Sequence, residues 1–199
     1  KRALESVREF FGRQVVPIHL PLGEEKDFRG VVDLVRMKAY VFEKDESGKF
    51  KEEDIPAGLK EEAAKKREEL VEMIAENDEK LMEKYLEKGE LSSEEVQAGL
   101  KKAVSGLQLF PVLVCSALSN IGTQNIAEAL INLLPSPVDR GEAKAKIKGN
   151  DGAVKPSPEE PFSALVFKTI SDPYTGRISL GRVFSGKANP DALVSNVSK

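Results

Sequence analysis

The sequence feature that most constrains the fold is an apolar run at residues 109–115, Leu-Phe-Pro-Val-Leu-Val-Cys. A continuous apolar run of this length is typical of a parallel strand that is buried on both faces. Small and polar residues follow at 116–122, and a helix is predicted to begin at Thr123, which we expect to be its cap. Strand, polar loop and helix in this order form half of an α/β unit, whose expected ligand-facing position is the loop at the carboxyl end of the strand.

The residues before this run predict a short helix and a small antiparallel sheet. Helical spacing of apolar residues over 4–11 predicts a helix that ends at Gly12. Residues 15–21 favour a short or edge strand, because two prolines interrupt a β-branched run. Residues 45–48 are expected to form a hairpin turn, with a return strand beginning at Phe50.

Residues 28–42, between these strands, alternate in polarity with the period of a strand. On one face the pattern places Val31, Val35, Met37, Ala39 and Val41. On the other face it places Arg36, Lys38 and Tyr40.

Residues 57–105 predict three amphipathic helices. Pro56 suits the first turn of the first helix, with Asp54 as its expected cap. Asn77 and Asp78 open a shorter helix that ends at Gly89, and a capping box of Ser92 and Glu95 opens the third, which ends at Gly106. The Met and Tyr residues of these helices are interpreted as core rather than as cofactor contacts.

The C-terminal part has a different composition. Residues 138–160 are rich in Lys, Gly, Ala and Pro and are interpreted as an interdomain linker. Three strands are then predicted at 162–169, 177–185 and 193–197, too few to close a β-barrel.

Charge and residue counts exclude several classes of protein. The net charge of −3 argues against a strongly basic nucleic-acid-binding module as the whole protein, and no apolar run of about 18 residues is present that would span a membrane. The single Cys rules out an internal disulfide and fits a reducing, cytoplasmic compartment. One Cys and one His are too few for an ordinary zinc site. The acidic excess is confined to residues 43–105, which carry a net charge of −7, whereas residues 1–42 and 106–199 each carry +2.

No enzyme motif is complete, and we expect neither a catalytic residue nor a metal ligand in this chain. Phosphate-loop, dinucleotide-binding and zinc-protease patterns are all absent. Cys115 and His19 are the one pair of nucleophile and base that can be considered, but no orienting acid stands at a recognisable spacing. Both residues are interpreted as packing residues.

Several motifs in order resemble bacterial elongation factor G. They lie at residues 16–23, 28–34, 111–118, 133–137, 160–168 and 172–177, including Ser116-Ala117-Leu118 and the segment Leu-Leu-Pro-Ser-Pro. The resemblance implies an α/β plus α+β fold, which begins within a partial GTPase-type α/β domain. Residues 1–137 are then the C-terminal part of that domain, with an inserted sheet-plus-helices subdomain at about 22–106. A linker at 138–160 and the start of an incomplete antiparallel β-barrel at 161–199 complete the expected organisation.

The same resemblance implies a function for the parent protein, a ribosomal translocase that hydrolyses GTP with Mg²⁺. The phosphate loop, both switches and the Asn-Lys-x-Asp motif would precede Lys1, so the fragment alone is expected to be inactive and to bind neither ligand. Ser116, Ala117 and Leu118 are implied to bind the guanine base, with the amides around Ala117 and Leu118 directed at guanine O6 and Ser116 bracing the loop.

The resemblance also implies partners on the ribosome. The helices at 57–105 are expected to face the ribosomal stalk protein, and the barrel domain the small-subunit rRNA through Lys168, Arg177, Arg182 and Lys187. Open barrel edges are expected to allow self-association. Two alternatives stay open: a similar GTPase that does not act in translocation, and a non-enzymatic interaction module.

Overall fold

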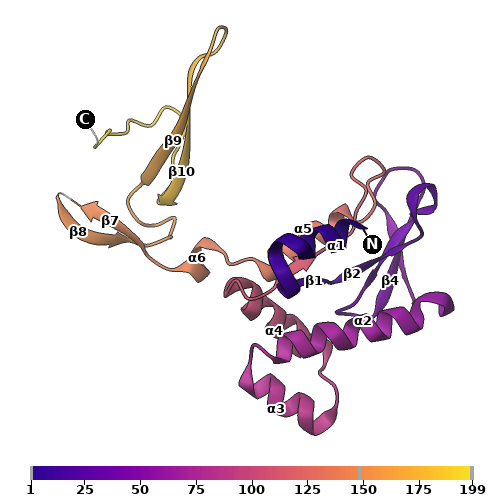
Figure 1. Cartoon of the computed structure of the whole chain (residues 1–199). Helices are drawn as coiled ribbons and strands as arrows, with labels where there is room; N and C mark the ends of the chain where they lie inside the picture. Colours follow the sequence, from indigo (N-terminus) through magenta and orange to yellow (C-terminus); the bar gives the residue numbers. More distant parts are fainter. Residues whose placement is uncertain (1, 148, 198–199) are drawn as a thin grey trace. The chain divides into compact units, whose positions relative to one another are not determined.

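A computed structural model describes residues 2–147 and 149–197, and the chain divides into one unit up to Leu134 and another from Pro135 onward. The described residues form a mixed α/β structure with several antiparallel sheets and no closed barrel. In the first unit the elements are α1 (Arg2–Phe11), the 3-10 helix η1 (Gly12–Gln14), β1 (Val15–Pro17), β2 (His19–Leu22), the 3-10 helix η2 (Glu25–Asp27), β3 (Gly30–Asp33), β4 (Lys38–Phe42), β5 (Phe50–Glu53), α2 (Ala57–Ala75), α3 (Glu79–Lys88), α4 (Ser93–Ser105), β6 (Phe110–Val112) and α5 (Thr123–Leu133) (Figure 1).

The predicted small sheet is present as four antiparallel strands in the order β2-β3-β4-β5. The predicted division of its faces is wrong, because Val31 lies opposite Tyr40 and Val32 lies opposite Ala39. The cause is a turn at residues 34–37, which interrupts the alternation between β3 and β4. The carboxylate of Asp33 holds this turn by accepting hydrogen bonds from the amides of Val35 and Arg36, at 2.7 and 2.9 Å.

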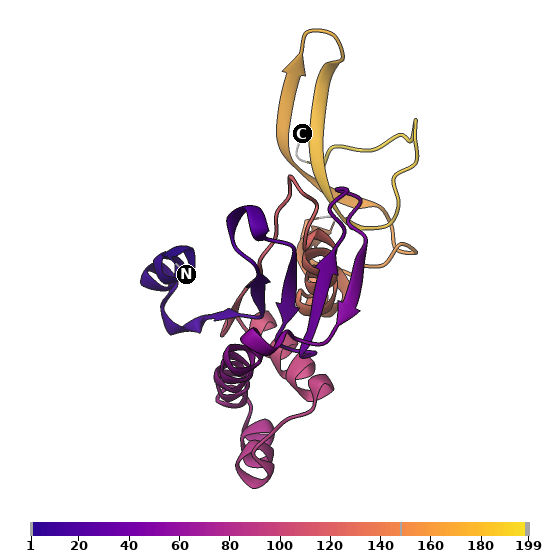
Figure 2. The ribbon, with the colours of Figure 1, turned by 90° about the vertical axis from the view of Figure 1, so that its right-hand side faces the viewer.

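Apolar side chains from the sheet and the helices form one main core. Val32, Leu34 and Ala39 of the sheet region pack with apolar residues of α2 and α4. Figure 2 shows the three helices α2–α4 grouped at one end of the sheet. A second, smaller cluster on the other face of the sheet joins Val31, Tyr40, Phe42 and Ile121.

The helix boundaries follow local capping signals. Asp78 caps α3, Gly89 ends it with a left-handed backbone at φ 73°, and Ser92 and Glu95 form the predicted capping box of α4. The expected cap of α2 is wrong, because Pro56 occupies the N-cap position and the carboxylate of Asp54 instead pairs with Lys38 at 2.9 Å.

The parallel pairing predicted for the apolar run is confirmed, whereas its length and burial are not. Only Phe110–Val112 form a strand, which pairs in parallel with β1 and is half-buried. Within the described residues β6 has β1 as its one strand partner, so its other edge and part of its surface stay open. Helix α1 next to this pair buries none of its residues, and Phe10 is 84% exposed.

The second unit consists of one short helix and two hairpins. Its elements are α6 (Pro137–Arg140), β7 (Ala143–Ile147), β8 (Asn150–Val154), β9 (Ser163–Asp172) and β10 (Gly176–Ser185). Residues 138–160, expected as a linker, therefore contain α6 and the β7–β8 hairpin. Gly149 has φ 86°, a left-handed value that glycine adopts without strain.

The predicted strands at 162–169 and 177–185 correspond to β9 and β10, which pair with each other in an antiparallel hairpin. The strand predicted at 193–197 is wrong, because these residues have no strand structure. A strand needs a neighbouring ladder, and β9 and β10 pair only with each other among the described residues. No helix in the described part of the chain is sufficiently long and apolar to cross a membrane.

Candidate functional site

The candidate site is the loop at residues 116–122, which connects β6 with α5 at the carboxyl end of the parallel pair. Leu113 packs against the main core, and Val114 packs against the second cluster. The chain is therefore anchored on both sides of the sheet just before the loop begins. This places the loop at the position that α/β units use to present ligand-contacting groups.

A ring of backbone hydrogen bonds closes this loop. The amide of Ser116 donates to the carbonyl of Ile121 at 2.8 Å, and the amide of Ile121 donates back at 3.0 Å. The amide of Asn120 donates to the carbonyl of Ala117 at 3.3 Å, and the amide of Ser119 donates to the hydroxyl of Ser116 at 3.4 Å. Ser116 thus contributes its amide, its carbonyl and its hydroxyl to the closure.

The amides of Ala117 and Leu118 stand apart from this ring. Neither donates a hydrogen bond to another group of the described residues. Both residues are exposed, and Leu118 is 90% exposed. Two adjacent backbone donors at the tip of a closed loop can be approached by the acceptor atoms of a ligand.

Gly122 and Asn120 in the loop, together with Gly48 in the β4–β5 turn, give the loop its shape. Sequence reasoning assigned this role to none of them. Gly122, not Thr123, is the N-cap of α5, with φ 75°, and a Cβ at this position would lie 2.7 Å from the carbonyl oxygen of Val114. Asn120 has a left-handed backbone with φ 51°, and its side chain contacts the β4–β5 turn near Gly48. A turn signal was visible at each glycine, but nothing in the sequence pairs Asn120 with a turn so distant along the chain.

Cys115 and His19 do not form a catalytic arrangement. Cys115 is exposed, contrary to the packing role predicted for it, because the strand ends three residues earlier. His19 is only 5% exposed in β2, opposite Asp33. No group of His, Cys, Asp and Glu side chains among the described residues is arranged to hold a metal ion.

His19 and Asn125 both line a cavity of about 50 Å³. Because His19 is buried, its charge state depends on whether the chain is folded. Its Nδ1 is buried and has no hydrogen-bond partner among the residues that the structure describes. Burial lowers the pKa of the imidazole below its ordinary value of 6.5, although the carboxylates of Asp33 and Glu128 act in the opposite direction. Neutral His19 therefore favours the folded chain.

This shift predicts how stability depends on pH. The pKa of His19 is lower in the folded than in the unfolded chain, so its contribution is complete above about pH 6.5 and is lost as the pH falls below that value. The free energy of unfolding is expected to fall by up to about 1.4 kcal/mol per pH unit below pH 6.5. Denaturant unfolding between pH 7.5 and 5 measures this fall, because Asp and Glu side chains titrate mainly at lower pH. His19 is the single histidine, so a His19→Gln variant with the same slope would contradict the assignment.

The four basic residues predicted to face RNA are exposed but do not form one patch. The β9–β10 register places Arg177 opposite Ser171 and Arg182 opposite Leu165. Because the two arginines are five positions apart on β10, they lie on opposite faces of the hairpin. Lys168 lies opposite Leu180, which is two positions before Arg182 on β10, and therefore shares a face with Arg182. Lys187 lies beyond β10, where its ammonium pairs with Glu159 at 3.3 Å.

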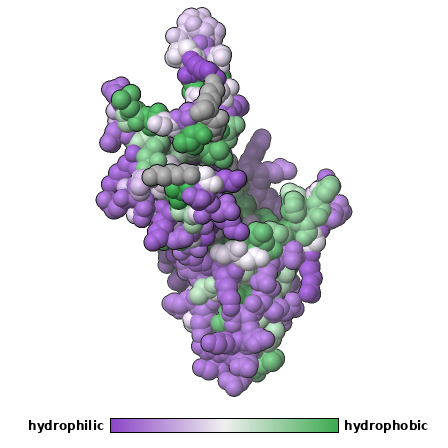
Figure 3. All heavy atoms as spheres, turned by 90° about the vertical axis from the view of Figure 1, so that its left-hand side faces the viewer, coloured by the Kyte–Doolittle hydropathy of each residue, from purple (hydrophilic) through white to green (hydrophobic). Residues whose placement is uncertain are grey.

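The helices α2–α4 present mainly charged side chains to solvent. The lower end in Figure 3, where these helices lie, is largely hydrophilic. Several of the charges pair locally, as in Lys66 with Glu69 and Lys102 with Asp78. The acidic excess predicted from the sequence is therefore carried on an exposed helical surface.

Comparison with known proteins shows a likeness to a longer bacterial protein. No protein-family model matches the chain. The structure is similar to the crystal structure of ttk003000868 from Thermus thermophilus, with a TM-score of 0.72 and 32% sequence identity over 93% of this chain. The chain spans 25% of the length of that protein, whose name states no activity.

Proposed function

We propose that this chain is an internal part of a bacterial translational GTPase of the elongation factor G type, in which residues 116–118 form one wall of the guanine pocket. The observation that carries the proposal is the pair of exposed, unbonded amides at Ala117 and Leu118. These donors would hold guanine O6, and the small side chain of Ala117 would let the base approach the main chain. The hydrogen bonds of Ser116 would keep the loop closed during binding.

The arrangement of elements supports the same proposal. The parallel pair β1–β6 and helix α5 have the strand-loop-helix order of a GTPase-type domain, and the four-stranded sheet with α2–α4 stands between β1 and β6 in the chain. The likeness to a much longer protein is consistent with a chain that is one segment of a larger factor. GTP and Mg²⁺ would be held largely by the phosphate loop and switches of that factor, where the bound nucleotide supplies the phosphoryl group for hydrolysis.

Ribosomal partners are part of the proposal. The exposed helical surface of α2–α4 is suited to a protein partner such as the ribosomal stalk, because its net negative charge disfavours direct contact with RNA phosphates. Lys168 and Arg182, which share one face of the β9–β10 hairpin, are the better-placed candidates for contact with small-subunit rRNA.

The guanine-binding role can be tested by changing one backbone donor. Leu118 occupies the second position of the turn closed by the Asn120 amide, a position that proline favours. In the longer protein that contains this chain, Leu118→Pro should remove the amide hydrogen and weaken guanine nucleotide binding by about tenfold or more. Leu118→Ala keeps that hydrogen and should leave the affinity unchanged, because the side chain is exposed.

Isothermal titration with GDP measures these affinities, and the isolated chain is expected to give no measurable binding. A longer wild-type protein that does not bind guanine nucleotides would contradict the proposed function. Equal affinities for the proline and alanine variants would remove Leu118 from the pocket.

A further inference from the structure

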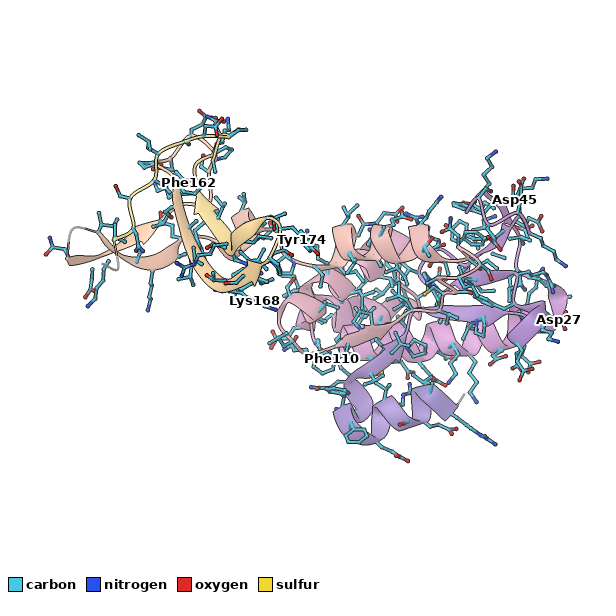
Figure 4. The ribbon with its side chains drawn as sticks, turned by 90° about the horizontal axis from the view of Figure 1, so that it is seen from above. Asp27, Asp45, Phe110, Phe162, Lys168 and Tyr174 are labelled. Carbon is cyan, nitrogen blue, oxygen red and sulfur yellow. The ribbon has the colours of Figure 1, made fainter. Side chains whose placement is uncertain are left out.

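We propose that the β4–β5 turn positions the loop at 116–122, and that Asn120 is the positioning residue through which it acts. For its effect on nucleotide binding this inference rests on the function proposed above. The turn and the loop lie side by side at the same end of the first unit in two views (Figures 1 and 2). Asp45 marks this turn in Figure 4.

The side chain of Asn120 joins three segments of the chain. Its Nδ2 donates a hydrogen bond to the carbonyl of Glu46 at 3.1 Å, across 74 positions of sequence. Its Oδ1 accepts a hydrogen bond from the hydroxyl of Thr123, at the first position of α5. One amide group therefore connects the β4–β5 turn to the end of the loop and to the helix that follows it.

The backbone of Asn120 determines how the loop presents its donors. Its conformation is left-handed, which asparagine tolerates better than most residues, and its amide donates to the carbonyl of Ala117 at 3.3 Å. This hydrogen bond closes the turn in which Ala117 and Leu118 lie. Movement of Asn120 would consequently redirect the two unbonded amides.

The β4–β5 turn is shaped to receive this side chain. Gly48 has φ 75°, and a Cβ at this position would lie 2.6 Å from Nδ2 and 3.1 Å from Cγ of Asn120. The turn is held independently by the amide of Ser47, which donates to Asp45 at 3.0 Å, and by the amide of Lys49, which donates to Ser47 at 3.1 Å. A preformed turn with no space beside Gly48 can thus fix the position of the asparagine.

A second contact ties the loop to the same sheet. Ile121, the next residue, is buried in the cluster that contains Val31, Tyr40 and Phe42. The polar contact of Asn120 and the apolar contact of Ile121 therefore both hold the loop to strands β3 and β4 and the turn that follows them. A displacement of this sheet would move the loop with it.

A pair of glycine variants isolates the contact from general strain. Gly48→Ala and Gly89→Ala both place alanine at nearly the same left-handed φ, 75° and 73°, but nothing lies within 4 Å of the Cβ at Gly89. Amide hydrogen exchange, measured by NMR on this chain, is expected to accelerate about tenfold or more at Asn120 and Ile121 in Gly48→Ala and to stay unchanged there in Gly89→Ala.

Asn120→Asp provides a second, nearly isosteric variant. Aspartate keeps the oxygen that accepts from Thr123 and tolerates the left-handed backbone, but it cannot donate to Glu46. It should accelerate exchange in the loop in the same way as Gly48→Ala. Unchanged exchange at Asn120 and Ile121 in Gly48→Ala, or unchanged exchange at Ile121 in Asn120→Asp, would overturn the inference.

Nucleotide affinity separates this inference from the proposed function. In the longer protein, Gly48→Ala should weaken GDP binding about tenfold and Gly89→Ala should not. If wild-type protein binds GDP and Gly48→Ala binds it equally well, the positioning role is wrong and the proposed function stands. If wild-type protein does not bind GDP but the loop exchange responds as expected, the proposed function fails and the structural coupling stands.

Discussion

Gly99→Val is expected to destabilise the first unit by about 3 kcal/mol, the upper end of the usual cost of overpacking. A Cβ at Gly99 of α4 would lie 2.5 Å from Cγ2 of Ile74 and 2.6 Å from Cδ1 of Leu81. Valine adds two further methyl groups at this contact, so α4 or the side chains of Ile74 and Leu81 must shift. Denaturant unfolding followed by circular dichroism measures the change.

Gly58→Val is the matched control for this prediction. Gly58 also lies in a helix, α2, but nothing lies within 4 Å of a Cβ at that position. Valine has a slightly higher helix propensity than glycine, so this variant should be neutral or slightly stabilising. Equal stability of the two variants would show that α4 does not pack closely against Ile74 and Leu81.

Arg67→Ala is expected to lower the free energy of unfolding by about 3 kcal/mol, because it removes several hydrogen bonds to partly buried carbonyls. The guanidinium of Arg67 donates to the carbonyl oxygens of Leu34 and Val35, at 2.7 and 2.5 Å, and more weakly to that of Leu91 at 3.4 Å. It therefore joins α2 to the β3–β4 turn and to the segment before α4. Burial lowers the pKa of this guanidinium from its ordinary value, and the group remains charged.

The adjacent residue provides the control for Arg67. Lys66 pairs with Glu69 one turn away on the same helix, at 2.6 Å, and both side chains are partly exposed. Such a pair contributes less than about 1 kcal/mol, so Lys66→Ala should change stability little. Thermal unfolding of the two variants compares a group that joins three segments with one that stays within its helix. Similar losses would contradict the role given to Arg67.

Features that depend on neighbouring residues could be predicted from the sequence. The boundaries of α3 and α4 follow from Asp78, Gly89 and the capping box at Ser92, each within one turn of the helix that it ends or begins. The hairpin turn at 45–48 and the parallel character of the strand in the apolar run were likewise predictable, from turn residues and from the continuous apolar run, whereas the identity of β1 as its partner was not.

Features that depend on distant contacts could not be predicted. The faces of the sheet were assigned wrongly because the carboxylate of Asp33 folds residues 34–37 into a turn that strand periodicity does not reveal. Gly122 replaces Thr123 as cap of α5 because the backbone must pass close to Val114. The candidate site at 116–118 was indicated by its resemblance and by its place after a strand, whereas the link from Asn120 to Glu46 depends on how the whole unit folds.

The pairing of β1 with β6 also has an evolutionary consequence. The chain leaves the parallel pair at Pro17, opposite Val112, and comes back to it at Phe110, opposite Val15. The two ends of the intervening stretch therefore lie on neighbouring strands, at opposite ends of a short pair. A stretch of polypeptide whose two ends lie on adjacent strands in this way can be lengthened, shortened or exchanged between lineages while the flanking strands keep their places. That freedom has a limit, because apolar residues of the stretch pack in the same core as Leu109 and Leu133. Any replacement must still cover these two leucines.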